Sequence, residues 1–164
     1  MKTYEIKEVA TKDEKELSKI LKNVLDEYGF PLNSEDRKQA ICEEYLNVFN
    51  KHDSFLFIIR NEEKLIGTAG IIPISNKNYK KEGYCELKHI YVSPSERGNG
   101  LGKEILKTCL KKAKVNGYKK CYLETLPYMT DARKLYTKSG FRSLDTPLIK
   151  KEYYNCEMWM EKAL

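Results

Sequence analysis

The sequence lacks any Cys-x-x-Cys pair, and it contains only two histidines among its 164 residues. Its cysteines are widely spaced, so neither a structural zinc site nor a disulfide framework is expected. An odd number of cysteines without a pairing pattern suits a reducing compartment. Cys109 and Cys121 lie on apolar faces of their segments, which favours core positions over a catalytic thiol. We therefore expect no metal site.

Long hydrophobic runs are also missing. No apolar stretch approaches the length of a membrane span, and the first residues form no apolar signal region. No low-complexity tract, internal repeat or linker interrupts the chain, whose composition is 41% hydrophobic and 33% charged. We expect one folded domain over residues 1–164, cytoplasmic and without a membrane partner.

Charge of one sign is only slightly in excess. The formal net charge is +6, from 30 basic and 24 acidic side chains that are interspersed along the chain. A solvated surface explains most of this pattern, and an anionic ligand such as a phosphate compound is the next interpretation. No DNA- or RNA-binding motif is present, so no nucleic-acid partner is expected.

Hydrophobic periodicity predicts the order β-α-α-β-β-β-α-β-α-β-β. Consecutive strands in the middle favour a mixed sheet over a purely parallel one, within an α/β (α+β) fold. A polar, lysine-rich loop is expected at residues 73–83. The expected strands are residues 4–9, 54–60, 64–72, 86–92, 119–124, one beginning at 141, and 155–161; the expected helices are residues 17–28, 35–49, 101–115 and 131–139.

The most informative stretch is Arg97-Gly98-Asn99-Gly100-Leu101-Gly102, between the expected strand 86–92 and helix 101–115. Glycines at alternate positions leave the backbone uncrowded where strand turns to helix. Backbone N–H groups can converge there, and the helix dipole adds partial positive charge. Such a loop is suited to bind phosphate.

Two common nucleotide motifs do not fit this loop. A Walker-type loop requires Ser or Thr after Gly102-Lys103, where the sequence has Glu104, and a Gly where it has Arg97. A dinucleotide fingerprint requires a Gly at position 103, and it usually lies early in the chain. A plain tight turn into a helix remains the structural alternative.

The pattern Arg97-x-x-Gly100-x-Gly102 resembles the signature of the GNAT N-acetyltransferase superfamily. Residues 132–141, Ala-Arg-Lys-Leu-Tyr-Thr-Lys-Ser-Gly-Phe, resemble that family's second motif, Ala-x-x-Leu-Tyr-x-x-x-Gly-Phe. Together with the element order, the resemblance covers nearly the whole chain. It implies a mixed, mostly antiparallel sheet of six to seven strands, about four flanking helices and a splayed strand pair.

The resemblance implies that acetyl-coenzyme A is the acyl donor. The main chain of Ile90, Tyr91 and Val92 would pair with the pantetheine arm in the wedge beside the splayed strand. The pyrophosphate would bind the amides of the loop, with a charge-assisted contact from Arg97. The implied cofactor residues of this loop are Arg97, Gly98, Asn99, Gly100, Leu101, Gly102 and Lys103.

The same resemblance gives Tyr136 the general-acid position, from which a phenol can protonate the departing thiolate. Packing in the core is the alternative role. Glu86 is the candidate base that helps deprotonate the amine, with Glu124 as a competitor and a charge pair with Lys88 as the structural alternative. His89 is expected on the opposite strand face from Glu86, as a structural residue.

One position departs from the family pattern. Many members have an Asn three residues before the second motif's Ala, and this chain has Met129. Thr130 or backbone groups are candidates to replace that pantetheine contact.

The expected activity is transfer of an acetyl group to a primary amine of a small molecule or peptide, by direct attack in a ternary complex. A non-catalytic acyl-coenzyme A binding module is the alternative. In this family the acceptor is set by segments that correspond to residues 28–32 and 145–155, and its identity cannot be read from them. A monomer and a homodimer are both consistent with the sequence.

Overall fold

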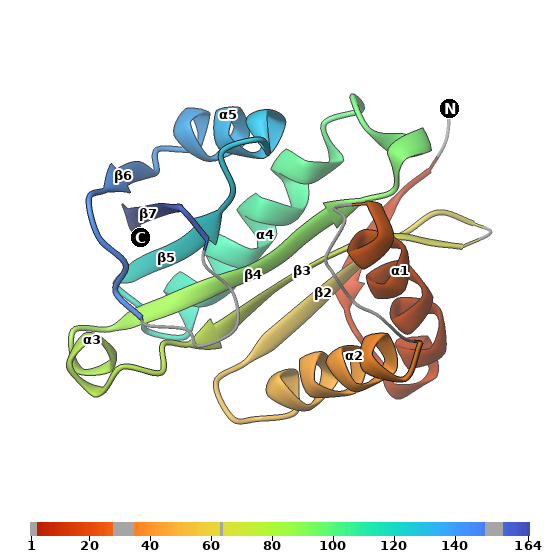
Figure 1. Ribbon diagram of the computed structural model, residues 1–164, viewed down its shortest axis with the longest axis horizontal. Coiled ribbons are helices and arrows are strands. Elements are labelled where there is room, and N and C mark those ends of the chain that lie inside the picture. Colours follow the sequence, from red (N-terminus) through yellow and green to blue (C-terminus); the bar gives the residue numbers. More distant parts are fainter. Residues whose placement is uncertain (1–2, 28–34, 63, 150–155) are drawn as a thin grey trace.

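The computed structural model describes residues 3–27, 35–62, 64–149 and 156–164 (Figure 1). The described residues form a seven-stranded sheet in the order β1-β2-β3-β4-β5-β7-β6. Its strands are β1 (Glu5–Glu8), β2 (Phe55–Arg60), β3 (Leu65–Pro73), β4 (Tyr84–Val92), β5 (Lys120–Thr125), β6 (Arg142–Leu144) and β7 (Met158–Ala163). Every neighbouring pair is antiparallel except β4 and β5, which are parallel.

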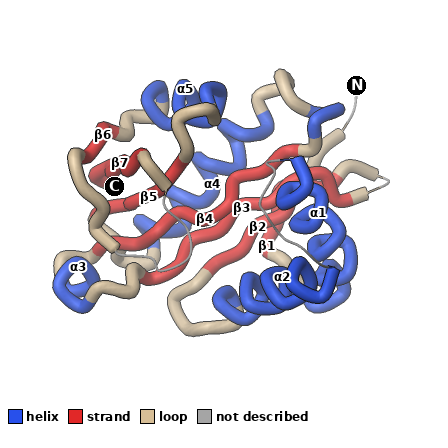
Figure 2. Tube along the Cα trace, viewed as in Figure 1, coloured by secondary structure: helices blue, strands red, loops and turns tan. Residues whose placement is uncertain are grey.

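Helices cover both faces of this sheet (Figures 1 and 2). The pair α1 (Glu14–Glu27) and α2 (Glu35–Phe49) lies over one face near β2 and β3, and α4 (Leu101–Val115) lies over the other. The shorter helices are α3 (Lys77–Lys81) beside the start of β4 and α5 (Thr130–Lys138) beside the start of α4. Single turns of 3-10 helix precede α1 and α4, at η1 (Thr11–Asp13) and η2 (Pro94–Glu96).

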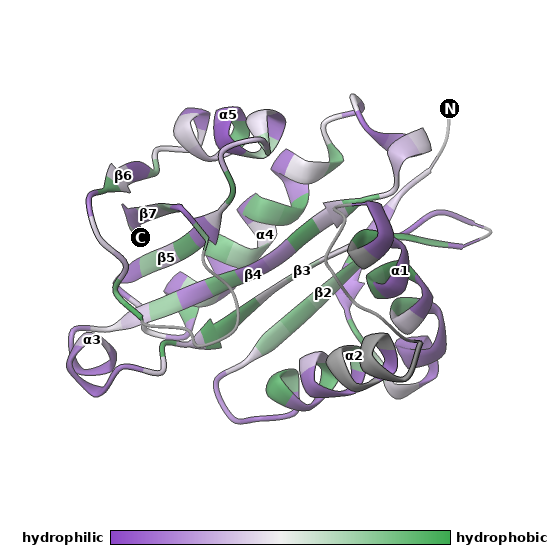
Figure 3. Ribbon diagram, in the orientation of Figure 1, coloured by the Kyte–Doolittle hydropathy of each residue, from purple (hydrophilic) through white to green (hydrophobic). Residues whose placement is uncertain are grey.

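Burial on two faces explains the sequence of the central strands. Phe57 and Ile59 pack under α4, whereas the alternating Leu56 and Ile58 pack under α1 and α2. A strand covered on both sides has no solvent-facing positions, so β2 is a nearly continuous hydrophobic run (Figure 3). The packed helices keep their charged residues on the outside.

The predicted splay is confirmed at the parallel pair. β4 and β5 are in register at three positions only, Tyr84 with Lys120, Cys85 with Cys121 and Glu86 with Tyr122. From Leu87 to Val92, β4 pairs with no described residue of β5, although it remains paired with β3. The strands β4 and β5 are therefore paired at the start of β4 and separate along its second half, which lines the opening between them.

Most predicted elements are present, with shifted ends. β4 begins two residues earlier than predicted, and β7 ends at Ala163 rather than at residue 161. The predicted loop at residues 73–83 was wrong in part, because residues 77–81 form α3. The side chain of Asn76 accepts a hydrogen bond from the Asn78 N–H at 3.0 Å and begins this helix. Cys109 and Cys121 are fully buried, as predicted.

Candidate active site

β4 is interrupted by a β-bulge just before its last two residues. Gly70 of β3 is opposite Lys88, and Thr68 is opposite Tyr91, so Ala69 faces two residues of β4. His89, one of those two, has a positive φ of 48°. A bulge of this kind bends the strand and reverses its alternation. It lies beyond Glu86, the last residue of β4 that pairs with β5.

The bulge corrects the predicted position of His89. Its ring packs edge-on against Tyr45 of α2, with centroids 4.8 Å apart, on the face covered by α1 and α2. Cys85 and Leu87 lie on the α4 face, so Glu86 between them lies on the same face as His89. The prediction of opposite faces assumed an unbroken alternation of two, which the extra residue removes. His89 is exposed.

The glycine loop (residues 97–102) connects η2 to α4. Gly98 and Gly100 have φ values of 82° and 79°, a conformation in which a side chain is strained. A Cβ at either position would meet nothing within 4 Å, so the space above the loop is open. Gly102 has no such φ, and a Cβ there would be 3.5 Å from the Leu135 side chain of α5. Two of the three glycines are thus required by the backbone.

The amide groups of this loop are unequally available. The N–H of Arg97 donates to Pro94 O, and the N–H of Lys103 donates to Gly100 O. Within the described part of the chain, the N–H groups of residues 98–102 have no protein acceptor. The phosphate site predicted for the amides of residues 97–103 is therefore best supported at these five. A pyrophosphate site at these amides stays a prediction.

Buried contacts fix the loop from below. Glu96 is 3% exposed, and it accepts a hydrogen bond at 2.9 Å from the hydroxyl of Tyr4, next to β1. The side-chain amide of Asn99 donates to Glu96 O at 3.2 Å. The glycines have no side chains that could restrict the loop conformation. The hydrogen bonds of Glu96 and Asn99 restrict it instead.

The side chain of Arg97 makes ionic and hydrogen-bond contacts within the protein. Its Nη1 and Nη2 bind the two carboxylate oxygens of Glu27 at 2.6 and 2.8 Å, and its Nε donates to Val92 O at 2.9 Å. The bidentate partner lies at the end of α1, 70 residues away in sequence. The expected contact between this guanidinium and the pyrophosphate stays a prediction.

Tyr136 lies on α5, against the helix that follows the glycine loop. Its side chain is 7% exposed and belongs to the cluster that contains Val92, Leu101 and Ile105. The ring packs at 61° to Phe141 with centroids 5.9 Å apart. Packing therefore accounts for the ring, and it brings α5 to the end of β4. A role for the hydroxyl in proton transfer stays a prediction.

The two candidate bases lie on adjacent strands. Glu86 is 3% exposed, and its carboxylate is 3.1 Å from the ammonium of Lys88, which is the charge pair considered as its structural role. Glu124, partly exposed near the end of β5, accepts a hydrogen bond from the Tyr122 hydroxyl at 2.8 Å. Both carboxylates are on the face opposite α4, beside the splay. Which of them acts as a base stays open.

The position that departs from the family pattern has a local role. Met129 precedes α5, where its carbonyl accepts the N–H of Arg133. Its sulfur is 3.7 Å from the hydroxyl of Thr125 at the end of β5. Met129 thus links the end of β5 to the start of α5, and Thr130 remains a candidate for the pantetheine contact. Of the segments expected to select the acceptor, residues 28–32 and 150–155 lie outside the described residues.

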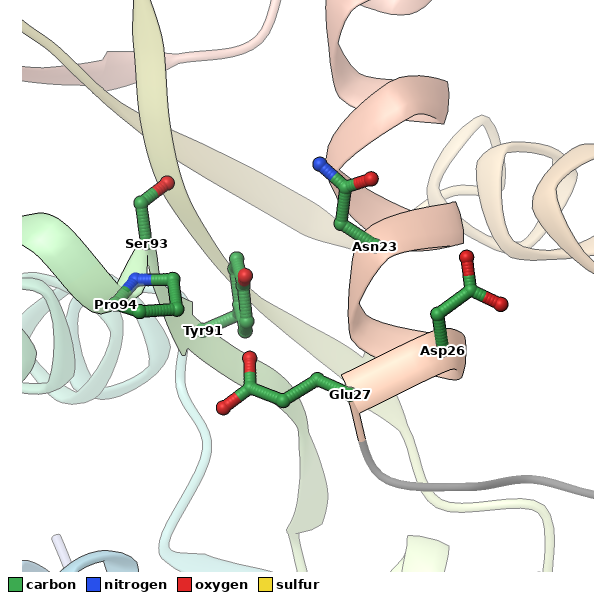
Figure 4. Close-up of a pocket in the computed structure, with 6 residues that line it drawn as sticks. All are labelled: Asn23, Asp26, Glu27, Tyr91, Ser93 and Pro94. Carbon is green, nitrogen blue, oxygen red and sulfur yellow. The ribbon is translucent and has the colours of Figure 1, made fainter.

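A hollow of about 580 Å³ lies where α1 ends beside β4 (Figure 4). The carboxylate of Glu27 points across it toward Tyr91 and Pro94. Its lining residues are Asn23, Asp26, Glu27, Tyr91, Ser93 and Pro94. It adjoins the glycine loop on the side of the sheet that carries Glu86.

A model of the acetyltransferase (GNAT) family matches residues 17–141. The curated relative YjgM of Escherichia coli, named an uncharacterized N-acetyltransferase, is 26% identical over 163 residues, covering 97% of this chain and 94% of that protein. A GNAT-family acetyltransferase from Staphylococcus aureus superposes with a TM-score of 0.79 at 20% identity, over 98% of this chain and 99% of the other.

A second solved structure is the PaiA N-acetyltransferase from Thermoplasma acidophilum in complex with coenzyme A. Its TM-score is 0.74 at 20% identity, and 99% of each chain is covered. At such identities these structures show the fold, whereas the family match rests on the sequence. The chain belongs to the acetyltransferase (GNAT) family.

Two further observations concern membrane-spanning helices and metal sites. No helix among the described residues is both long and apolar enough to cross a membrane. No three His, Cys, Asp or Glu side chains in the described ranges are grouped in a way that could hold a metal ion. The expectation of metal-independent activity stays a prediction.

Proposed function

We propose that this protein transfers an acetyl group from acetyl-coenzyme A to a primary amine of a small molecule or peptide. The observation that carries the proposal is the glycine loop, where the five amides of residues 98–102 have no acceptor among the described residues and where a Cβ at Gly98 or Gly100 would meet nothing within 4 Å. This loop adjoins the splayed end of β4. The family membership and the structural neighbour with bound coenzyme A support the same ligand.

Acetyl-coenzyme A supplies the acetyl group as a thioester. The amides of residues 98–102 would bind its pyrophosphate, and the main chain of Ile90, Tyr91 and Val92 would align its pantetheine arm within the opening. Lys103, exposed in the first turn of α4, would add a positive charge near the phosphates. These residues would hold the thioester at the mouth of the splay.

The chemistry requires one proton to leave the amine and one to reach the sulfur. An alkylammonium has no lone pair, so Glu86 or Glu124 would accept its proton, directly or through water. The free amine would then attack the acetyl carbonyl in the ternary complex. Tyr136, on the helix beside the loop, would donate a proton to the departing sulfur.

Calorimetry with two acyl donors tests the proposed site. Acetyl-pantetheine keeps the thioester and the arm but lacks the pyrophosphate. The proposal predicts that acetyl-coenzyme A binds at least about tenfold more tightly, since charge-assisted hydrogen bonds from the loop would be lost. Equal affinity for the two donors would show that the glycine loop does not bind the pyrophosphate.

A further inference from the structure

We propose that Glu27 is a positioning residue for the acetyl-coenzyme A site, which it serves by holding Arg97 against β4. The inference rests on the proposed function. Neither residue needs to touch the ligand. Glu27 lies at the C-terminal end of α1, and Arg97 begins the glycine loop, so their contact joins two elements that the chain itself does not connect closely.

The contact has the geometry of a clamp. Arg97 presents two parallel N–H groups to the two oxygens of Glu27, at 2.6 and 2.8 Å. Its third donor, Nε, binds Val92 O at 2.9 Å, and its guanidinium lies 5.5 Å from the centroid of the Tyr91 ring. A planar guanidinium held at three donors and one face has a single orientation.

That orientation fixes where the loop begins. The chain leaves β4 at Val92, turns through η2 and returns at Arg97, whose side chain then binds back to Val92 O. The next residue, Gly98, has a positive φ and no side chain to hold it. Glu27 thus holds the first residue of the loop, in addition to the contacts that Glu96 and Asn99 make. A loop that is already ordered loses less conformational entropy when the ligand binds.

The positive charge of Arg97 is paired with the carboxylate of Glu27. The hydrogen bonds from Arg97 lower the pKa of the Glu27 carboxyl below its usual value, despite the opposing effect of partial burial. The pair is therefore ionised at neutral pH. This arrangement gives an experimental contrast, because a clamp and a competing counter-ion predict opposite effects of removing the carboxylate.

Coenzyme A binding, measured by calorimetry, separates the two roles. Glu27→Gln removes a negative charge near a polyanionic ligand. By charge alone, it should tighten binding, and it should tighten it further if Arg97 were released toward the pyrophosphate. The clamp predicts the reverse, a loss of about three- to tenfold in affinity, the modest size expected for a partly exposed pair.

Asp26→Asn is the matched control. Asp26 precedes Glu27, lines the same hollow and carries the same charge. This variant removes one negative charge from the same hollow and leaves the Glu27–Arg97 pair in place, so it should bind coenzyme A as the parent does or slightly more tightly. A double variant, Glu27→Gln with Arg97→Gln, should bind no more weakly than Arg97→Gln alone, since both changes open one clamp.

A second readout needs no ligand. Glu27→Gln should speed hydrogen exchange in the free protein at the two hydrogen-bonded amides that border the loop, those of Arg97 and Lys103, and Asp26→Asn should not. Unchanged or tighter coenzyme A binding by Glu27→Gln would overturn the assignment, and so would unchanged exchange at these two amides. Failure of the parent to distinguish acetyl-coenzyme A from acetyl-pantetheine would instead overturn the proposed function, and the assignment with it.

Discussion

The hydroxyl of Tyr122 donates a hydrogen bond of 2.8 Å to the carboxylate of Glu124, two residues further along β5. Tyr122 is fully buried, and burial, together with the neighbouring carboxylate, raises the pKa of its phenol well above the usual value. The phenol therefore remains a donor throughout the working pH range. It is also the register partner of Glu86, so one tyrosine lies between the two candidate bases.

This arrangement makes the choice of base testable. Glu86→Gln and Glu124→Gln each keep the shape of the side chain and remove one carboxylate. The residue that accepts the amine proton should, when changed, lower the rate chiefly at low pH, where the acceptor is mostly ammonium. Part of the rate should return at high pH, because free amine needs less help.

The measurement is the pH dependence of kcat/KM for the two variants and the parent. We expect Glu86→Gln to show the steeper loss. An unchanged profile for Glu86→Gln beside an altered one for Glu124→Gln would assign the base to Glu124. Two unchanged profiles would leave deprotonation to water.

Tyr136→Phe should lower kcat by about 10²–10⁴-fold, the usual contribution of a general acid, with little effect on acetyl-coenzyme A affinity. The ring and its contact with Phe141 remain, so the core should be preserved. Tyr118→Phe is a suitable control, since it also removes one hydroxyl, which donates to Asp53 O at 2.9 Å far from the loop. Equal turnover by Tyr136→Phe and the parent, under conditions where chemistry limits the rate, would return Tyr136 to a packing role alone.

Gly100→Ala should weaken coenzyme A binding by about tenfold or more, because it adds a Cβ to the open face of the loop and strains a φ of 79°. Gly117→Ala is the matched control. Gly117 also has a positive φ, of 87°, and open space around it, but it lies at the other end of α4. Both variants should lose similar thermal stability in the absence of ligand, whereas the melting-temperature increase produced by coenzyme A should shrink for Gly100→Ala only.

Gly70→Ala should destabilise the protein by about 1–3 kcal/mol, the range typical of overpacking. A Cβ at Gly70 of β3 would be 2.1 Å from the Phe49 ring at the end of α2. Gly102→Ala, with its nearest atom at 3.5 Å, should cost far less. Urea unfolding checks both variants, and adding Phe49→Ala to Gly70→Ala should restore part of the loss. Equal stability of Gly70→Ala and the parent would mean that α2 is not packed as described.

Core positions and the backbone of the glycine loop could be predicted from local sequence patterns. The alternation of β2 and the spacing of α4 place their residues in the core because each pattern matches one secondary-structure period. The backbone of the glycine loop was also predictable, since Gly98 and Gly100 adopt a conformation that other residues rarely do. The order of elements followed from these local signals.

Contacts between distant residues could not be predicted in this way. The ion pair of Glu27 with Arg97 depends on where α1 packs, which no local pattern records. The bulge at His89 arises from the pairing of β4 with β3, and it reversed the predicted face of that side chain. Short helix α3 was missed because its five residues are polar apart from Tyr79, and one aromatic residue shows no helical period.

The most direct test of the account is amine-dependent release of free thiol from acetyl-coenzyme A, measured against a panel of amino acids, diamines, aromatic amines and short peptides. The account predicts that at least one class accelerates release well above slow hydrolysis. Mass spectrometry should then find an acetylated amine in equal amount, and Gly100→Ala should reduce both products together. Tight coenzyme A binding without acceleration by any amine would contradict it, and would favour a protein that binds acyl-coenzyme A without transferring the acyl group.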